Sequence, residues 1–380
     1  MLEIVKFIHE HEDWETLLSA APYNLKISWD DGFVLFKYNQ INSDFNEPIC
    51  LEARGLILDS TDNFRVVRMA FKKFFNLGEP FAAHIDWNTA VATEKIDGSI
   101  MSVWFARGKW HLSTNATIDA FKAPLSGVGP YKNFGELFES VLPLSTFANY
   151  NKHRCWTFEL VSPYNKVVID YPETKVYLLS VRDMDSLEEL GLDVVEMLAD
   201  ANGLTVPERY DLNNEADYRK VVEQMPEGHE GIVVRDVNGE RVKIKTLLYF
   251  QMHRARNNGV LTLERAIELI LANDHAEFLS YFPEYTDYFN SVAAVVNGVY
   301  TIARTWDSTG LQAKWEENFS ARVAKKQFAL NFAKKMAGGL QALAFKCYDG
   351  NGEKWLSTLT AAQWTRVFAH QFSFIKEVVQ

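Results

Sequence analysis

Three lysines lie in two stretches whose residue types suit nucleophilic and anion-binding chemistry. The first stretch, Thr93 to Ser99, places Lys95 after an alternating apolar lead-in and directly before Asp97 and Gly98. A neutral lysine amine is a nucleophile, and a strand end beside a tight turn would hold it on a rigid element. We therefore predict that Lys95 is a nucleophile. The alternative is a surface lysine before an Asp-Gly turn, and this stretch alone does not separate the two.

The second stretch, residues 241–245, carries Lys243 and Lys245 on a predicted strand. Residues two apart on a strand point to the same face, so the two ammonium groups would lie side by side. Like charges repel, which favours a site that holds an anion between them. The alternative is an exposed sheet edge that is protected by lysines.

Other polar residues occur where apolar neighbours make them unexpected. Arg54 is flanked by apolar residues, which suggests that its guanidinium is aimed at a carboxylate or phosphate. Lys73 lies among phenylalanines in residues 71–79, which is also typical of a buried aromatic cluster with lysines reaching to solvent. Glu159 lies on a largely apolar strand, where an unpaired carboxylate costs free energy.

Strands must position most of these residues. The alternating apolar pattern predicts strands at residues 25–38, 50–59, 91–94, 100–106, 109–114, 155–161, 166–170, 176–182, 230–236 and 241–245. The 50–59 strand is expected to break at Gly55. For Gly98 we predict a backbone conformation that residues with side chains resist.

Helical spacing marks the start of the chain, three stretches between residues 134 and 224, and four stretches after residue 260. It predicts helices within residues 1–21, 134–147, 193–202, 215–224, 261–271, 287–304, 321–337 and 361–379. Strand patterns stop near residue 253. We therefore predict an α+β, mainly antiparallel-sheet domain over residues 1–253 and an all-helical domain over residues 254–380.

Composition narrows the class of protein further. The chain has 380 residues and a net charge of −11, with the acidic excess concentrated before residue 254, so nucleic-acid binding would need a local basic channel. Three separated cysteines, Cys50, Cys155 and Cys347, without a Cys-x-x-Cys pair argue against disulfides and a zinc site. We expect a cytoplasmic protein without a membrane segment or signal peptide.

Taken in order, these stretches resemble the motifs of covalent nucleotidyltransferases, the superfamily of ATP-dependent ligases and mRNA-capping enzymes. The matching segments are Lys95 to Gly98, Phe158-Glu159, residues 176–180, Glu230-Gly231 and residues 242–245. Ala53-Arg54-Gly55, residues 71–76 and the helical tail resemble the phage-type RNA ligase 1 family in particular. This resemblance implies an ATP-grasp-like ligase fold for the first domain and an RNA- or tRNA-specificity role for the second.

The resemblance also implies roles for the site residues. Lys95 would attack the ATP α-phosphate and hold AMP, with Lys243 and Lys245 on that phosphate. An unperturbed lysine is neutral at pH 7 only at a cost of about 4–5 kcal/mol, which nearby cations lower. Nucleotide contacts are implied for Arg54, Lys73, Glu94, Gly98, Glu159 and Glu230, with Glu94 at the adenine edge. The resemblance also places Glu159 and Glu230 near a hydrated Mg²⁺ ion, which Mn²⁺ can replace.

The implied activity is joining of RNA 5′-phosphate and 3′-hydroxyl ends through lysyl-AMP and adenylylated RNA, in RNA or tRNA repair by a monomer. Rival hypotheses are a DNA ligase or capping-type enzyme, and a non-catalytic RNA-end binding protein. A DNA ligase or capping enzyme usually carries a β-rich domain after the catalytic one, whereas residues 254–380 look helical. One departure concerns Ser113 to Thr117, where the family pattern has a lysine, so triphosphate contacts are expected to be rearranged.

Overall fold

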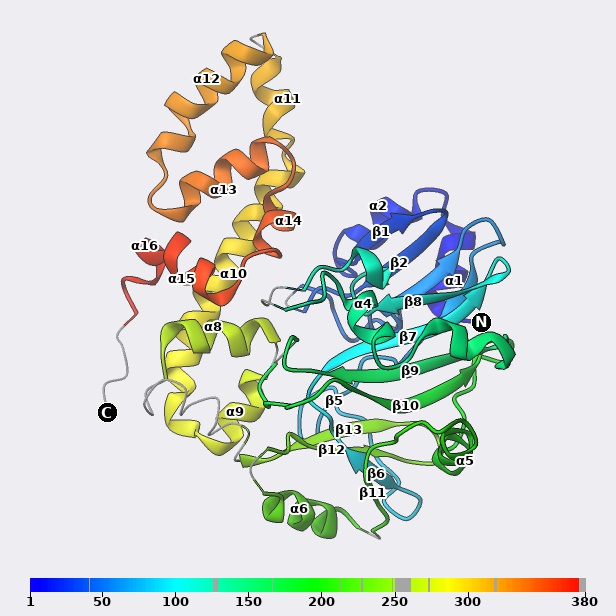
Figure 1. The fold of residues 1–380 in the computed structure, drawn as a ribbon. Coiled ribbons are helices and arrows are strands. Elements are labelled where there is room, and N and C mark those ends of the chain that lie inside the picture. The colour runs from blue at the N-terminus through cyan, green and yellow to red at the C-terminus, as the bar shows by residue number, and fades with distance from the viewer. Residues whose placement is uncertain are drawn as a thin grey trace. The chain divides into compact units, whose positions relative to one another are not determined.

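The computed structural model describes residues 1–375 except 41, 126–128, 166, 213, 227, 248, 250–260, 273 and 318–319. The chain divides into two compact units, Met1–Tyr249 and Phe250–Gln380. The predicted boundary at residues 253 and 254 lies outside the described residues. Figure 1 shows the first unit as sheets with short helices and the second as helices, which agrees with the predicted fold class.

Three sheets build the first unit. The first sheet has the order β1-β2-β3-β4, the second β10-β9-β7-β8 and the third β11-β6-β12-β13-β5. Every pairing is antiparallel except β13 with β5, which is parallel. The strands are β1 Lys26–Asp30, β2 Phe33–Lys37, β3 Arg54–Asp59, β4 Arg65–Arg68, β5 Phe75–Asn76, β6 Val91–Glu94, β7 Ser99–Ala106, β8 Lys109–Thr114, β9 Arg154–Val161, β10 Lys175–Asp183, β11 Arg209–Tyr210, β12 Gly231–Arg235 and β13 Arg241–Lys245.

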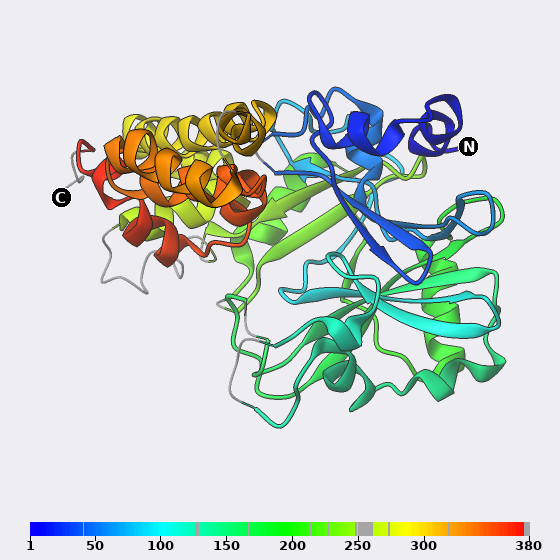
Figure 2. The ribbon, with the colours of Figure 1, turned by 90° about the horizontal axis from the view of Figure 1, so that it is seen from above.

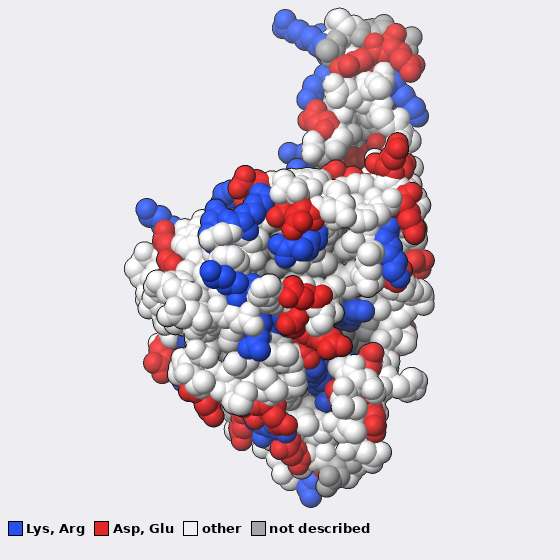
Figure 3. All heavy atoms as spheres, turned by 90° about the vertical axis from the view of Figure 1, so that its right-hand side faces the viewer, with Lys and Arg blue, Asp and Glu red and all other residues white. Residues whose placement is uncertain are grey.

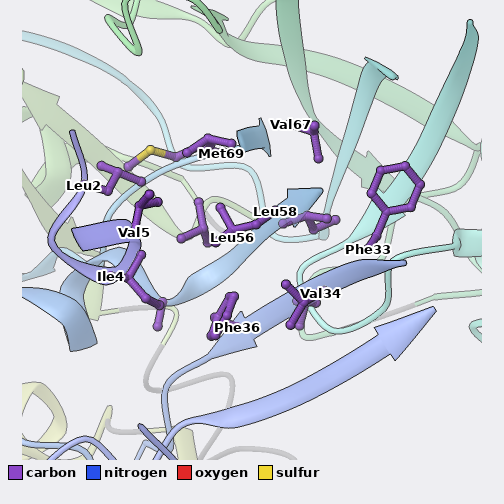
Figure 4. Close-up of a cluster of buried hydrophobic side chains, with 14 of the residues drawn as sticks. Leu2, Ile4, Val5, Phe33, Val34, Phe36, Leu56, Leu58, Val67 and Met69 are labelled. Carbon is purple, nitrogen blue, oxygen red and sulfur yellow. The ribbon is translucent and has the colours of Figure 1, made fainter. Parts of the chain in front are cut away.

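The first sheet is buried by helices at the start of the chain. Residues 33–36 of β2 are all buried, so both faces of this strand are covered. Figure 4 shows side chains of β2 and β3 packed with Leu2, Ile4 and Val5 from the N-terminal segment. The helices of this unit are α1 Glu3–Glu10, α2 Trp14–Ser19, α3 Pro48–Glu52, α4 Phe134–Glu139, α5 Leu192–Asn202 and α6 Glu215–Gln224, with 3₁₀ turns η1 Ala120–Lys122 and η2 Leu144–Asn149.

The third sheet has one apolar face. Ala92, Ile232, Val242 and Ile244 pack in a buried cluster with Tyr218 of α6. Because side chains alternate along a strand, the residues between them lie on the opposite face. That opposite face carries Lys243 and Lys245, so alternation in the sequence already separated the core from the candidate site.

The second unit contains only helices among its described residues, and Figure 2 shows them from a second direction. They are α8 Leu263–Ala272, α9 His275–Tyr281, α10 Thr286–Ser308, α11 Leu311–Glu316, α12 Ala321–Asn331, α13 Gly339–Tyr348, α14 Gly352–Leu356, α15 Ala361–Val367 and α16 Ala369–Phe372, with η3 Pro283–Tyr285 and η4 Ala333–Lys335. The predicted helices at 321–337 and 361–379 are each broken, at Phe332 and Phe368, whose backbone angles are not helical. Residues 376–379 lie outside the described residues.

Three predictions in the first unit are wrong in part. Residues 50–52 belong to α3 rather than to a strand, and β3 begins at Arg54 and continues through Gly55, which has φ +74°. The helix predicted at 134–147 ends at Glu139 and is followed by η2. Residues 167–170 form no strand because the backbone N–H groups of Val168 and Ile169 donate to the Asp97 carboxylate instead of to a neighbouring strand.

Two surface properties bear on function. On the face drawn in Figure 3, Lys and Arg side chains alternate with Asp and Glu instead of gathering in one basic tract. None of the helices in the described part of the chain combines the length and apolarity that a membrane crossing requires.

Candidate active site

Lys95 follows the last residue of β6 and continues the ladder with β12. Its backbone N–H donates to the Gly231 carbonyl at 2.8 Å, and Gly231 in turn pairs with Lys245 of β13. Residues opposite each other in neighbouring strands point to the same face, so Lys95, Gly231 and Lys245 form one row across the sheet. Gly231, with φ +147°, has no side chain to separate the two lysines.

Glu230 connects the two lysines of this row. Its Oε2 lies 2.5 Å from Lys95 Nζ, and its Oε1 lies 3.4 Å from Lys245 Nζ. The side chains of Glu230 and Lys245 are 3% exposed, whereas that of Lys95 is 22% exposed. The short contact holds the Lys95 amine in a fixed direction at the buried Glu230 carboxylate. Lys95 is therefore an ion-paired, partly accessible residue and not a free surface lysine.

Lys243 lies one row away from this ion-paired group on the same face. It pairs with Val233 of β12 and with Asn76 of β5, and its carbonyl accepts a hydrogen bond from Leu77 N–H. Because β13 lies between β12 and β5, the alternative of an exposed lysine-rich sheet edge is wrong. Lys243 and Lys245 thus lie on one face of a strand that has a neighbour on each side.

Gly98 is required by close approach and not by an unusual backbone conformation. Its φ lies outside the left-handed region, so the predicted reason is wrong. A Cβ at this position would lie 2.4 Å from the Leu160 carbonyl oxygen and 3.0 Å from a Val161 methyl group. The turn after Lys95 therefore packs directly against the backbone of β9.

Asp97 is a site residue whose role the sequence pattern did not predict. Its buried carboxylate accepts hydrogen bonds from the N–H groups of Val168 and Ile169 at 2.8 Å and from the Tyr249 hydroxyl at 3.4 Å. Burial, with the nearby Glu230 charge, raises the pKa of Asp97. The position within Lys-x-Asp-Gly was the only available signal, and the partners come from distant segments.

Glu159 lies on β9 opposite Ile100 of β7 and is buried. Burial raises the pKa of Glu159 to about 8, although the Lys95 charge acts in the opposite direction. The charges of Glu230, Arg54 and Asp97 also act on this carboxyl group. The structure thus brings Glu159 into the electrostatic neighbourhood of Lys95.

Arg54 and Lys73 both lie against aromatic rings. The Arg54 guanidinium carbon is 4.8 Å from the ring centroid of Phe74, and Arg54 Nη1 is buried without a hydrogen-bond partner. Lys73 Nζ lies 5.1 to 5.6 Å from the ring centroids of Tyr38, Phe45 and Phe75. The predicted aromatic cluster is therefore real, and it orients Lys73 by cation–π contacts.

Glu94 has its polar groups engaged within the protein. Its backbone N–H donates to the Glu208 carbonyl at 2.7 Å, and its Oε1 lies 2.6 Å from His229 Nδ1. The dipeptides Glu94-Lys95 and His229-Glu230 are thus joined by two side-chain contacts. His229 was missed from the sequence because a single histidine before a Glu-Gly pair carries no pattern.

The residues present suit a nucleotide with a divalent cation. Arg54 offers an unpartnered buried donor, and Lys95, Lys243 and Lys245 supply positive charge for phosphate. No cluster of three or more His, Cys, Asp or Glu side chains among the described residues could hold a metal by itself. A divalent cation here would therefore need water and nucleotide phosphates as further ligands, which is how Mg²⁺ is commonly bound.

Comparison with known proteins gives independent information. A family model described as RNA ligase matches residues 52–253. The RNA ligase of Rhodothermus phage RM378 is 24% identical over 385 residues, covering 84% of this chain and 86% of that protein. The putative bifunctional polynucleotide kinase/RNA ligase of Autographa californica nuclear polyhedrosis virus is 26% identical over 71% of this chain, which spans only 40% of that protein's length.

Solved structures include similar chains at low identity. An archaeal ATP-dependent RNA ligase is 15% identical, with a TM-score of 0.47, and the match covers 76% of this chain and 78% of that one.

Proposed function

This chain belongs to the RNA ligase family, and from that premise we propose that it is an ATP-dependent ligase that joins RNA 5′-phosphate and 3′-hydroxyl ends. The observation that carries the proposal is the row of Lys95 and Lys245 about the buried Glu230 carboxylate. A nucleophilic amine beside a second cation suits attack on a phosphorus atom that carries negative oxygens.

In the proposed first step, Lys95 Nζ attacks the α-phosphorus of ATP. An N–P bond forms, the P–O bond to pyrophosphate breaks, and the amine loses its proton. Glu230, 2.5 Å from Nζ, is placed to accept this proton. Lys245 and Lys243 stabilise the charge on the phosphoryl oxygens, and bound Mg²⁺ would supply further charge neutralisation.

Two further transfers complete the proposed reaction. An oxygen of the RNA 5′-phosphate attacks the phosphorus of lysyl-AMP and releases Lys95, which gives adenylylated RNA. The 3′-hydroxyl of the second end then attacks the RNA phosphate, forms the phosphodiester and releases AMP. Arg54 and Lys73 are assigned to the nucleotide sugar and phosphates, the backbone at Glu94 to the adenine edge, Gly98 to the nucleotide pocket, and Glu159 to the ribose or the hydrated Mg²⁺.

The decisive experiment is covalent labelling. Purified protein is incubated with Mg²⁺ and ATP or GTP labelled on the α-phosphate and is then denatured. We expect label from ATP and none in Lys95→Ala. Label from GTP would favour a capping-type enzyme, and absence of label in the wild type would favour a non-catalytic RNA-end binding protein. Label that persists in Lys95→Ala would refute the assignment of the nucleophile.

We further propose that the substrate is broken RNA, including tRNA cleaved in its anticodon loop, and that the helical unit selects it. The protein would act as a monomer, with Mn²⁺ able to replace Mg²⁺. Competition between a cleaved tRNA and a linear RNA with identical ends tests the substrate. Equal rates on the two RNAs, or preferential sealing of nicked DNA, would contradict this choice.

A further inference from the structure

Arg68, the last residue of β4, is 0% exposed and has only neutral hydrogen-bond acceptors among the described residues. Its Nη1 donates to the carbonyl oxygens of Gly55 and, at 3.4 Å, of Arg54. Its Nη2 donates to Asn115 Oδ1 at 2.8 Å, and its Nε has no partner. A fully buried guanidinium is therefore held by three uncharged oxygens.

Arg54 places a second guanidinium group beside the first. The Arg54 charge helps burial to lower the pKa of Arg68 to about 10, so Arg68 remains protonated at neutral pH. Arg54 itself lies over Phe74 and has a buried Nη1 without a partner. Arg54, whose charge acts on the Glu159 carboxyl group, thus links Arg68 to the candidate site, and each of the two guanidinium groups has one buried nitrogen without a hydrogen-bond partner.

Three other arginines of this unit, whose side chains are 10–13% exposed, share one carboxylate. Arg182, Arg235 and Arg241 all contact Glu189, whose side chain is 6% exposed. Burying a cation without an anion is unfavourable, so the missing carboxylate at Arg68 calls for another source of negative charge. A bound phosphate group would supply it.

The backbone around Arg68 is shaped for this arrangement. Gly55 has φ +74°, and a Cβ there would lie 2.4 Å from Arg68 Nη1 and 2.9 Å from the Asn115 carbonyl oxygen. Only glycine allows β3, Arg68 and the segment after β8 to approach so closely. The charge of Arg68 is therefore held at a fixed place behind Arg54.

We infer that Arg68 is a positioning residue of the nucleotide site: it fixes the backbone of Arg54, and its unpaired charge reinforces Arg54 in attracting a phosphate group. This inference rests on the proposed function. The phosphate belongs either to the ATP triphosphate or to the RNA 5′ end, and the arms of the experiment separate these two sources.

The first test compares Arg68→Gln with Arg65→Gln, which alters an exposed arginine on the same strand. Three steps are measured separately: lysyl-AMP formation, transfer of AMP to 5′-phosphorylated RNA, and sealing of pre-adenylylated RNA. For Arg68→Gln we expect KM to rise about tenfold in the first or second step, with kcat changed less than about threefold. A rise for ATP assigns the charge to the triphosphate, and a rise for RNA assigns it to the 5′-phosphate.

A second variant avoids truncating the arginine. Asn115→Asp keeps the shape of the acceptor but gives Arg68 a carboxylate partner, which neutralises its charge. We expect the same rise in KM without loss of thermal stability, whereas a merely structural arginine would tolerate this change. Arg68→Lys keeps the charge, and its KM should stay within about threefold of the wild type.

Calorimetric binding of pyrophosphate separates failure of this inference from failure of the proposed function, since it requires no catalysis. If the charge acts on the ATP triphosphate, Arg68→Gln and Asn115→Asp should both weaken pyrophosphate binding about tenfold; if it acts on the RNA 5′ end, both should instead weaken binding of a 5′-phosphorylated RNA by that factor. The inference would be overturned if Asn115→Asp changed neither KM nor pyrophosphate binding. It would also be overturned if Arg68→Gln lost activity equally in all three steps.

Discussion

The Nζ atom of Lys95 lies 2.5 Å from Oε2 of Glu230, a buried carboxylate 135 residues further along the chain. This contact holds the Lys95 amine in a fixed direction. The second oxygen of Glu230 faces Lys245, so one carboxylate orients both cations.

Removing the Lys95 amine should abolish only the first chemical step. Lys95→Ala cannot form lysyl-AMP, but it should still seal a pre-adenylylated RNA donor, since that step uses the other site residues. Gel analysis of the joined product, with and without ATP, measures this. If the variant fails to seal while its thermal stability equals that of the wild type, Lys95 has a role beyond nucleophilic attack.

Neutralising Glu230 should misplace both lysines. We expect Glu230→Gln to slow lysyl-AMP formation about a hundredfold, because a small displacement of a reacting group is enough for such a loss. Glu240→Gln, an exposed position on the β12–β13 hairpin, is the matched control. A rate within threefold of the control would show that Glu230 does not orient the nucleophile.

Adding one methyl group at Gly98 should push the nucleophile loop away from β9. The contact of 2.4 Å with the Leu160 carbonyl involves backbone, which cannot easily move, so Gly98→Ala should lose about 1–3 kcal/mol of unfolding free energy. Its lysyl-AMP formation should fall as well. Gly191→Ala, where a Cβ would meet nothing within 4 Å, should leave both quantities unchanged. Thermal melts and labelling compare the pair.

Glu159 should make stability depend on pH. Its pKa is raised to about 8 in the folded state from an ordinary value of 4.5, so the folded state retains a proton that the unfolded chain releases. The free energy of unfolding should therefore fall as pH rises from 4.5 to 8, by on the order of 1–4 kcal/mol from this group. Glu159→Gln should flatten this dependence. Denaturant melts over a pH series measure the free energy of unfolding of the wild type and of Glu159→Gln. An equal change with pH in the two proteins would contradict the prediction.

Glu189 should be a major determinant of stability. It binds Arg182, Arg235 and Arg241, and Arg182 also donates to the carbonyls of Met69 and Ala70 at 3.2 Å, so this cluster joins segments of all three sheets. Glu189→Gln would leave the buried Arg182 and the partly buried Arg235 and Arg241 without their carboxylate and should cost about 3–5 kcal/mol.

The exposed neighbour Glu188 provides the control, and Glu188→Gln should melt like the wild type. The arginines lower the pKa of Glu189, so its stabilisation should be present above the ordinary carboxyl range and lost as pH falls through the lowered value. Equal melting of Glu189→Gln and Glu188→Gln near pH 7 would show that the cluster contributes no net stability.

Much of the local structure of the site follows from residues that are neighbours in the sequence. Alternation along residues 241–245 placed Lys243 and Lys245 on one face, and the Asn-Gly turn paired this strand with β12. Lys95 at the end of a strand was equally visible. These features depend on neighbours in sequence, because side-chain direction and turn geometry are set within a few residues.

Which polar groups come into contact depends on the packing of segments that are far apart in the chain. The pairing of Lys95 with Glu230, the packing of Gly98 on Leu160 and the capture of residues 168 and 169 by Asp97 all join segments far apart in the chain. The missing carboxylate at Arg68 also became visible only in the folded chain. Such contacts depend on strand register and on how the sheets pack, and no local pattern encodes either of them.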